Sequence, residues 1–377
     1  MKKQAGQPGV RHTYSKMEST YNAATHPNRL SSSLTTHSDR FSSSLTANIF
    51  VILGVARSGT SVIARALKTL GINLGDHLTP PGKWNPTGFW EDNDVVYQIN
   101  QRLLDQLNFR WDSTKLLELN NEKPICKTMQ ASATAIIKQR YLHHNHWGFK
   151  DPRTVRILPF WQTIFTTLQL NEHYVIALRN PLCSANSFSD LGRNDMEKGL
   201  LLWLMHLFPA IEQTHGKKRI VVSYENMMQD PSKELERIQQ QFNLPPVSAE
   251  EKQQYVEKFL DKKLDHYHFT YADLVSHPAT KISALILKCY DCLWKLAQDE
   301  LRFDNPAFTT LWNDIKQEFI NNYVNYCYID TLLIENTQMR KNLRSIQRSL
   351  SWRMIYPLRF VEQGVRLFRR WIKGEVY

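Results

Sequence analysis

The segment around residue 54 constrains the fold most. An apolar run at 50–53 leads into a loop bounded by Gly54 and Gly59, and apolar residues at helical spacing follow as far as Leu70. A tight turn between a buried strand and a helix exposes several backbone N–H groups toward one point, and the helix dipole adds positive potential there. The segment therefore predicts a phosphate-binding turn at the edge of a parallel sheet. The alternative is a tight strand–helix turn with incidental glycines.

The same loop limits which phosphate compound it suits. Its glycine spacing is that of the Walker A pattern, but Thr60 stands where that pattern needs a lysine, and Arg57 is the only cation in the loop. Without the lysine, the β- and γ-phosphates of a nucleoside triphosphate lose their usual partner. The loop therefore predicts phosphate binding without magnesium-assisted triphosphate chemistry.

The rest of the chain predicts an α/β fold: a P-loop NTPase-like parallel sheet with helices on both faces, followed by a helical extension. Strands are expected at 49–53, 147–149, 174–178 and 219–222, and helices near 60–70, 93–107, 154–169 and 195–214. The expected divisions are a Ser/Thr-rich disordered tail at 1–46, the α/β domain at 47–270, and a helical extension with a basic tail at 271–377.

A second anion site is indicated by Arg179, which comes directly after the predicted strand at 174–178. Pro181 suits the first turn of a helix, which would carry Ser187 about two turns further on. An arginine and a serine that converge at this edge can hold a phosphate by charge-assisted hydrogen bonds. The alternative is a surface arginine beside a capping serine.

Three motifs together resemble the PAPS-dependent sulfotransferase family, over about residues 48–245. They are the loop 57–61, the Arg-Asn-Pro at 179–181 with a serine at 187, and the Ser-Tyr-Glu segment at 223–231. The loop is closer to those of carbohydrate and protein-tyrosine sulfotransferases than to those of small-phenol enzymes. The glycine-rich C-terminal nucleotide loop of the small-phenol enzymes is not evident.

The resemblance implies roles for individual residues. The 5′-phosphosulfate of the donor PAPS would be bound by Arg57, Ser58, Gly59, Thr60 and Ser61. The 3′-phosphate would be bound by Arg179 and Ser187, and the adenine would lie near Tyr224. PAPS is therefore the expected sulfate donor.

Sulfuryl transfer needs positive groups to offset the charge that develops on the leaving phosphate. Arg57 can serve this purpose, and so can Lys150, which directly follows a predicted strand. The Lys-Asp-Pro at 150–152 is similar to a segment of tyrosine sulfotransferases that stabilises the transition state. The alternative is a solvent-exposed lysine, with Asp151 capping the next helix.

A general base is expected at Glu91, because Phe89 and Trp90 would partly desolvate its carboxylate and raise its proton affinity. Asp92 and His77 are the alternatives for this role. Glu91 and Asp92 also fit the acidic first turn of the following helix. No metal site is expected, since sulfuryl transfer needs none and the histidines at 143, 144 and 146 have no carboxylate or cysteine at ligand spacing.

The formal net charge of +11 is uneven, since residues 340–377 hold ten Lys/Arg and two Glu. The excess of basic over acidic residues is therefore weak evidence for nucleic-acid binding, and no nucleic acid is expected as a partner. The tail combines basic residues with helical apolar spacing, which is typical of a helix on an anionic membrane, with a partner-docking helix as the alternative. The five scattered cysteines indicate buried thiols in a reduced compartment, so a cytoplasmic enzyme is expected. If the tail binds a membrane, the enzyme would be peripheral on the inner face of the cell membrane.

The expected reaction is metal-free in-line transfer to a hydroxyl of a carbohydrate or glycolipid. One rival class is a P-loop nucleotide or carbohydrate kinase that uses ATP and magnesium. The other is a non-catalytic nucleotide-binding scaffold, which would keep the loop but would not depend on Glu91 or Lys150.

Overall fold

The structure is a computed structural model, which describes residues 47–82, 85–189, 195–260, 267–278 and 284–352, together with 354, 355 and 365. The predicted disordered tail at 1–46 lies outside the described residues. So does most of the basic tail after residue 352, of which only 354, 355 and 365 are described. Residues 45–377 form one compact unit. The division of the chain at residue 270 stays a prediction.

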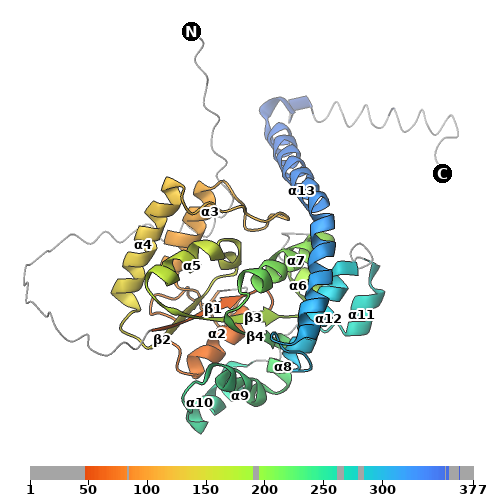
Figure 1. Ribbon diagram of the computed structural model, residues 1–377. Helices are drawn as coiled ribbons and strands as arrows, with labels where there is room; N and C mark the ends of the chain where they lie inside the picture. The colour runs from red at the N-terminus through yellow and green to blue at the C-terminus, as the bar shows by residue number, and fades with distance from the viewer. Residues whose placement is uncertain are drawn as a thin grey trace, which may run out of the picture. The chain divides into compact units, whose positions relative to one another are not determined.

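The core is a four-stranded parallel sheet (Figure 1). Its order is β2-β1-β3-β4, and the strands are β1 Asn48–Leu53, β2 His146–Lys150, β3 Asn171–Leu178 and β4 Lys218–Ser223. All three pairings between neighbours are parallel. The four predicted strands lie within these bounds, and the predicted α/β class is confirmed.

Both faces of the sheet are buried, which explains why its strands read as nearly unbroken apolar runs. Along β1, Phe50 and Ile52 point to one face, where they pack with α2 (Thr60–Thr69) and α9 (Pro231–Phe242). Ile49, Val51 and Leu53 point to the opposite face and join a larger core. That core lies under α4 (Pro124–Arg140), α5 (Leu158–Thr167), α7 (Met196–Gln213) and α12 (Ala284–Ala297). The alternation follows the two-residue period of a strand, and it gives the sheet a layer of helices on each side.

The helices that complete the fold are mostly those expected. One that the sequence analysis did not place runs from Pro124 to Arg140. The helical elements are α2 Thr60–Thr69, η1 Asp94–Gln101, α3 Arg102–Gln106, α4 Pro124–Arg140, η2 Pro152–Arg156, α5 Leu158–Thr167, α6 Pro181–Ser189, α7 Met196–Gln213, α8 Tyr224–Gln229, α9 Pro231–Phe242, α10 Ala249–Gln254, η3 Tyr255–Phe259, α11 Tyr271–Ser276, α12 Ala284–Ala297 and α13 Pro306–Arg348.

The C-terminal helices pack on the α/β core. Helix α12 contacts β4 and α7, and it buries Cys289 and Cys292 as the sequence predicted. Near the start of α13, Phe308, Trp312 and Phe319 are buried, and Phe319 stacks on Phe208 of α7 with ring centroids 3.8 Å apart. The helical extension thus shares the core of the sheet.

Within the described ranges, no helix combines the length and the apolar character needed to span a bilayer.

Parallel strands bring their carboxyl ends to one edge of the sheet, and each end is followed by a predicted site residue. The glycine loop follows β1, Lys150 ends β2, Arg179 follows β3 and Tyr224 follows β4. The chain passes from β1 to β2 on one side and returns to β3 on the other, so the strand order reverses at β1. Ligands of open α/β sheets bind in the crevice at such a reversal.

Candidate active site

The glycine loop has the backbone geometry of an anion cradle. Arg57 has a φ of 71° and Gly59 a φ of 78°, and Gly59 is the N-cap of α2. The first-turn N–H groups of a helix have no partner within the helix, so this end attracts an anion. A Cβ on Gly59 would stand 2.4 Å from Cδ2 of Tyr224. Only glycine therefore allows the loop to lie against that ring.

The two predicted anion sites meet. Arg57 Nε donates to Oγ of Ser187 at 2.8 Å, although the two residues are 130 positions apart. Arg179 Nη1 donates to the carbonyl oxygen of Arg57 at 3.1 Å, and Ser58 and Ser184 hydroxyls lie 3.1 Å apart. Two guanidinium groups and several hydroxyls thus stand at the carboxyl ends of β1 and β3. The arrangement suits a ligand with two separate anionic groups.

Tyr224 borders the same place. Its ring lies under the guanidinium of Arg179, whose Cζ is 4.3 Å from the ring centroid. Trp203 fixes the backbone beside it, because its indole N–H donates to the carbonyl oxygen of Arg179 at 3.0 Å. The predicted neighbours of the 3′-phosphate and the adenine are therefore in contact with each other.

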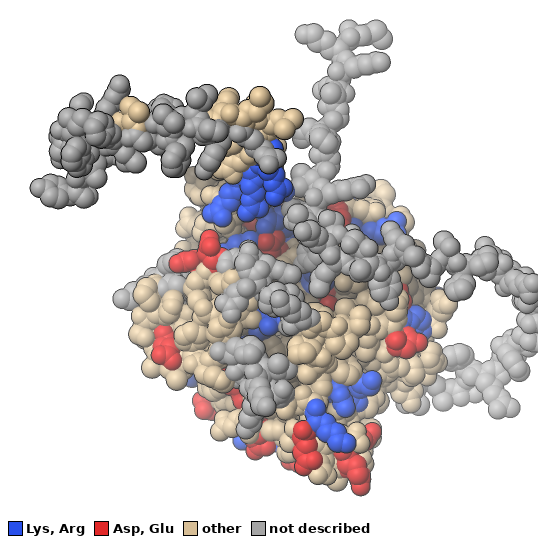
Figure 2. Space-filling view, turned by 180° about the vertical axis from the view of Figure 1, so that it is seen from behind, with Lys and Arg blue, Asp and Glu red and all other residues tan. Residues whose placement is uncertain are grey.

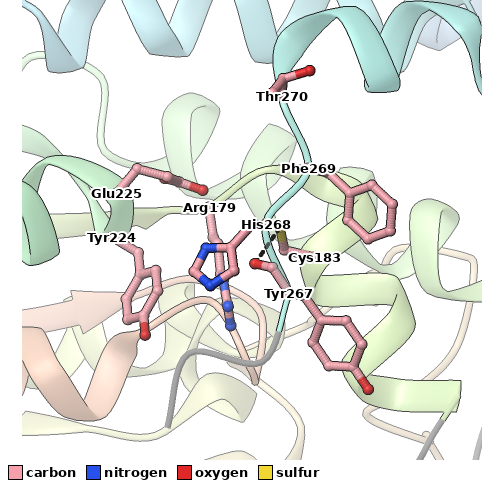
Figure 3. A pocket seen from close by; sticks show the side chains of 8 residues that line it. All are labelled: Arg179, Cys183, Tyr224, Glu225, Tyr267, His268, Phe269 and Thr270. Atoms are coloured by element: carbon pink, nitrogen blue, oxygen red, sulfur yellow. Dashed lines mark hydrogen bonds between the residues drawn. The ribbon is translucent and has the colours of Figure 1, made fainter. Parts of the chain in front are cut away.

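A cavity of about 150 Å³ opens at this contact. Its lining comprises Arg179, Cys183, Tyr224, Glu225, Tyr267, His268, Phe269 and Thr270. Figure 3 shows the His268 ring in front of the Arg179 side chain, between the rings of Tyr224 and Tyr267 in this view. A cavity of about this size accepts a single aromatic ring in other proteins, so its dimensions and its aromatic walls suit part of a heterocyclic base.

The wall at 267–270 was not found from the sequence. Asn180 Nδ2 donates to the carbonyl oxygen of Phe269 at 2.9 Å, and Cys183 Sγ donates to that of Tyr267 at 3.2 Å. These bonds attach the segment to the start of α6. The segment carries no glycine-rich signature, and its only local signal is the capping box formed by Thr270 and Asp273 at the start of α11.

Glu91 and Lys150, the predicted base and the predicted transition-state cation, form an ion pair. Lys150 Nζ donates to Glu91 Oε1 at 2.7 Å, and both residues are buried. Lys150 pairs in register with Ile52 of β1, which places it beside the start of the glycine loop. The sequence alternative of a solvent-exposed lysine is thus wrong.

The loop that carries Glu91 is tied to the glycine loop. Ser61 Oγ donates to the carbonyl oxygen of Phe89 at 3.2 Å, and Asn85 Nδ2 donates to Ser61 Oγ at 3.0 Å. Trp90 has a φ of 57° and packs against Phe259, with ring centroids 5.8 Å apart. The ion pair and the phosphate cradle therefore belong to one connected site.

Asp92, the first alternative for the base, is held by Arg140 on the far side of this loop. Both of its oxygens accept from Arg140, at 3.0 and 2.7 Å, and Oδ1 also accepts from the backbone N–H of Asp94. Partial burial alone would lower the pKa of Arg140. The hydrogen bonds that Arg140 donates to Asp92 and Asp76 outweigh this effect, so its pKa lies above the usual value. His77, the second alternative, is exposed and lies 3.4 Å from Asp94. Both alternatives belong to this network around Arg140.

Asp151 has the capping role that the sequence suggested. Its Oδ1 accepts from the backbone N–H and from Nε of Arg153, and its Oδ2 accepts from Asn100 Nδ2 at 2.9 Å. Arg153 thus supports Asp151. Of the three histidines at 143, 144 and 146, His146 lies 3.3 Å from Asn48 Nδ2, His144 contacts Asn73, and the ring of His143 packs against that of His144. Among the described residues, no group of three or more His, Cys, Asp or Glu is placed to hold a metal ion.

Comparison with known proteins gives a family. The model of the sulfotransferase family matches residues 49–249, which is more than half of the chain and includes every predicted site residue. A search of curated protein sequences gives no significant match.

Solved structures that the chain resembles include the sulfotransferase domain from the Synechococcus PCC 7002 olefin synthase, at 15% identity and a TM-score of 0.34 over 73% of this chain and 94% of that one. The sulfotransferase domain from the curacin biosynthetic pathway matches at 15% identity and a TM-score of 0.33, over 73% and 99%. Sulfotransferase STF9 from Mycobacterium avium matches at 16% identity and a TM-score of 0.32, over 63% of this chain and 76% of that one. These TM-scores are too low to carry an argument about the site. The family match does not depend on them, and by it this chain belongs to the sulfotransferase family.

Proposed function

We propose that this protein transfers a sulfuryl group from PAPS to a hydroxyl of a carbohydrate or glycolipid. The observation that carries the proposal is the junction of the two anion sites. Arg57 bonds to Ser187, and Arg179 bonds to the backbone of Arg57, across the reversal in strand order. PAPS has two anionic groups on one ribose, the 5′-phosphosulfate and the 3′-phosphate, and such a ligand would engage both sites at once.

The adenine of the donor would enter the cavity beside Tyr224. Its walls at Tyr224, His268 and Phe269 supply aromatic surface, and Arg179 stands at the same cavity for the 3′-phosphate. The segment 267–270 would thus take the part that the glycine-rich C-terminal loop has in small-phenol sulfotransferases.

The proposed reaction requires no metal. Glu91 accepts the proton of the attacking hydroxyl as the new O–S bond forms, and the S–O bond to the 5′-phosphate breaks in line with the attack. Lys150 and Arg57 offset the negative charge that collects on the departing phosphate. Lys150 Nζ and Glu91 Oε1 are 2.7 Å apart. Glu91 would therefore contact the acceptor hydroxyl, and Lys150 the leaving phosphate, from neighbouring positions in the site.

The acceptor is proposed as a carbohydrate hydroxyl because the loop carries Arg57 where small-phenol enzymes usually have lysine. We also propose that the basic tail at 340–377 recruits the protein to the cytosolic face of an anionic membrane, where a glycolipid acceptor would be presented. Removal of residues 357–377 should then abolish sedimentation of the protein with phosphatidylglycerol vesicles. Unchanged sedimentation would refute the proposed recruitment to the membrane.

The acceptor class is tested by transfer of radiolabelled sulfate from PAPS to a panel of glycans, glycolipids and simple phenols. The proposal is supported if the wild type labels a glycan or a glycolipid and the Glu91→Gln variant does not. Transfer to phenols alone would overturn the acceptor class and leave the donor intact. A protein that binds the donor and labels nothing in the panel would favour the nucleotide-binding scaffold.

A further inference from the structure

Helix α13, which spans Pro306–Arg348, presents two apolar faces. The first packs on the core of the molecule, and its members are buried: Phe308, Trp312, Ile315, Phe319 and Tyr326. At about 100° per residue, these five side chains lie within roughly 60° of arc on the helix. From Thr331 onward the helix has no buried residue in the part that the structure describes.

The second face is exposed and is defined here as the outer stripe. Its apolar members are Val324, Tyr328, Leu332, Met339, Leu343 and Ile346, all of them large and exposed. Their mean direction lies roughly 160° from that of the buried face, at about 100° per residue. The stripe therefore points away from the core along the whole of its length, and Figure 1 shows α13 running past α12 into this projecting part.

The spacing of the outer stripe is regular. With Glu335 included, its members follow one another at steps of 4, 4, 3, 4, 4 and 3 residues. This is an eleven-residue repeat, whose period of about 3.67 residues per turn is close to that of a straight helix. Such a repeat keeps one seam in line over about six turns, which is what packing against another long helix requires.

Charge on the projecting part lies opposite to the stripe. Arg340, Lys341, Arg344 and Arg348 have a mean direction roughly 160° from that of the stripe, at about 100° per residue. Figure 2 shows Lys and Arg gathered on this part of α13. If the stripe lay on a membrane, these cations would point away from the lipid headgroups. In a pair of helices they stay in water on the outside, as charged residues do in coiled coils.

The area also fits a helix pair. The six apolar side chains of the stripe leave on the order of 650 Å² exposed, close to the ~800 Å² that each partner of a standard protein interface buries. A second copy of the chain offers the same stripe, and a two-fold axis makes the surface complementary to itself. We propose that the outer stripe of α13 pairs with the outer stripe of a second copy, so that the protein is a homodimer.

Charge selects the direction of the pair. In a parallel pair, Glu335 would face Glu335 of the second copy at the seam, and two like charges at close range destabilise the pair. In an antiparallel pair, Leu332 lies opposite Leu343 of the second copy, and Tyr328 lies opposite Ile346. Glu335 then lies opposite Met339 of the second copy, away from its own counterpart. The proposed pair is therefore antiparallel.

The test compares the mass of the full chain in solution with that of three variants, by light scattering at micromolar concentration. The wild type should have twice the mass of one chain, while Leu332→Glu and Leu343→Lys should each be monomeric. The matched control is Thr337→Glu, which places the same charge on the exposed opposite face of α13 and should leave the dimer intact.

Mixing gives the decisive result. Leu332→Glu and Leu343→Lys, combined in equal amounts, should recover the dimer, since antiparallel pairing sets the new carboxylate against the new ammonium. A monomeric wild type, or a wild-type dimer that Leu343→Lys leaves intact, would overturn the proposal. Failure of the mixture to dimerise would overturn the antiparallel arrangement. Vesicle binding that Leu332→Glu abolishes and Thr337→Glu preserves would assign the stripe to lipid instead.

Discussion

Lys150 Nζ lies 2.7 Å from Glu91 Oε1, in an ion pair that is buried between the end of β2 and the loop before η1. Loss of either partner of a buried ion pair leaves the charge of the other uncompensated in a poorly solvated place. In the proposed reaction Glu91 takes the proton of the acceptor hydroxyl, and Lys150 offsets the charge that collects on the departing phosphate. The pair therefore links the fold of this edge to its chemistry.

Glu91→Gln should abolish sulfuryl transfer and leave affinity for PAP, the desulfated donor, within about threefold of the wild type. The amide has the shape of the carboxylate but cannot take the proton. Single-turnover kinetics measure the transfer step, and calorimetry measures PAP binding. Turnover close to that of the wild type would remove Glu91 from the mechanism.

Lys150→Ala should lower both stability and activity, since it leaves the Glu91 carboxylate buried without its partner. The loss of stability is expected to be about 3–5 kcal/mol, the cost of breaking a buried pair from one side. The double variant Lys150→Met with Glu91→Leu should recover most of the stability and none of the activity. Chemical denaturation measures the first quantity and sulfate transfer the second. If the double variant transferred sulfate, the pair would have no catalytic role.

Gly59→Ala should abolish donor binding, because a Cβ there would stand 2.4 Å from the Tyr224 ring in the wall of the site. The matched control is Gly71→Ala. Gly71 has a similar positive φ, of 84°, but its Cβ would enter open space. The control should lose about 1 kcal/mol of stability from backbone strain and bind PAP normally. Equal loss of PAP binding in both variants would mean that strain, and not contact with Tyr224, explains the effect.

Asp92→Asn should destabilise the protein and leave the pH dependence of turnover unchanged, since Asp92 holds Arg140 and caps η1. Thermal unfolding and a pH–rate profile measure the two effects. A shifted acidic limb in the profile would return Asp92 to the list of bases.

His173 should make the fold less stable in mild acid. Burial lowers its pKa to about 4, and Lys218 adds to this effect, while an unfolded histidine titrates near 6.5. Between these values the unfolded chain binds the proton more readily, so stability falls as pH drops from about 6.5 to 4. The fall in melting temperature between pH 7 and pH 4.5 should be smaller for His173→Gln than for the wild type. His143→Gln, at an exposed position, is the control and should behave as the wild type does.

The sheet could be predicted from the sequence because strands that are buried on both faces appear as short apolar runs, and the chain has four of these. Helix α4 was missed although its buried residues, Cys126, Met129, Ala133 and Ile137, follow helical spacing after Pro124 at its first position. These residues are small or mixed with polar neighbours, so the apolar stripe is weak.

The glycine loop and Arg179 could be assigned because each follows a predicted strand directly, and parallel strands end at one edge. Tyr224 was assigned through the resemblance of its segment to the sulfotransferase family. Two features could not be found in this way. The segment 267–270 reaches the site through bonds to α6, and the contact of Glu91 with Lys150 joins residues 59 positions apart. Both depend on tertiary packing, which local spacing does not encode.

The most direct test of the account is calorimetric titration of the full chain with PAP, run beside ATP with magnesium. The account predicts micromolar PAP binding that weakens about 10- to 100-fold in Arg179→Ala, the loss expected for a hydrogen-bonded charge, and little response to ATP. Tight binding of ATP with no PAP signal would contradict it and place the loop with the nucleotide kinases.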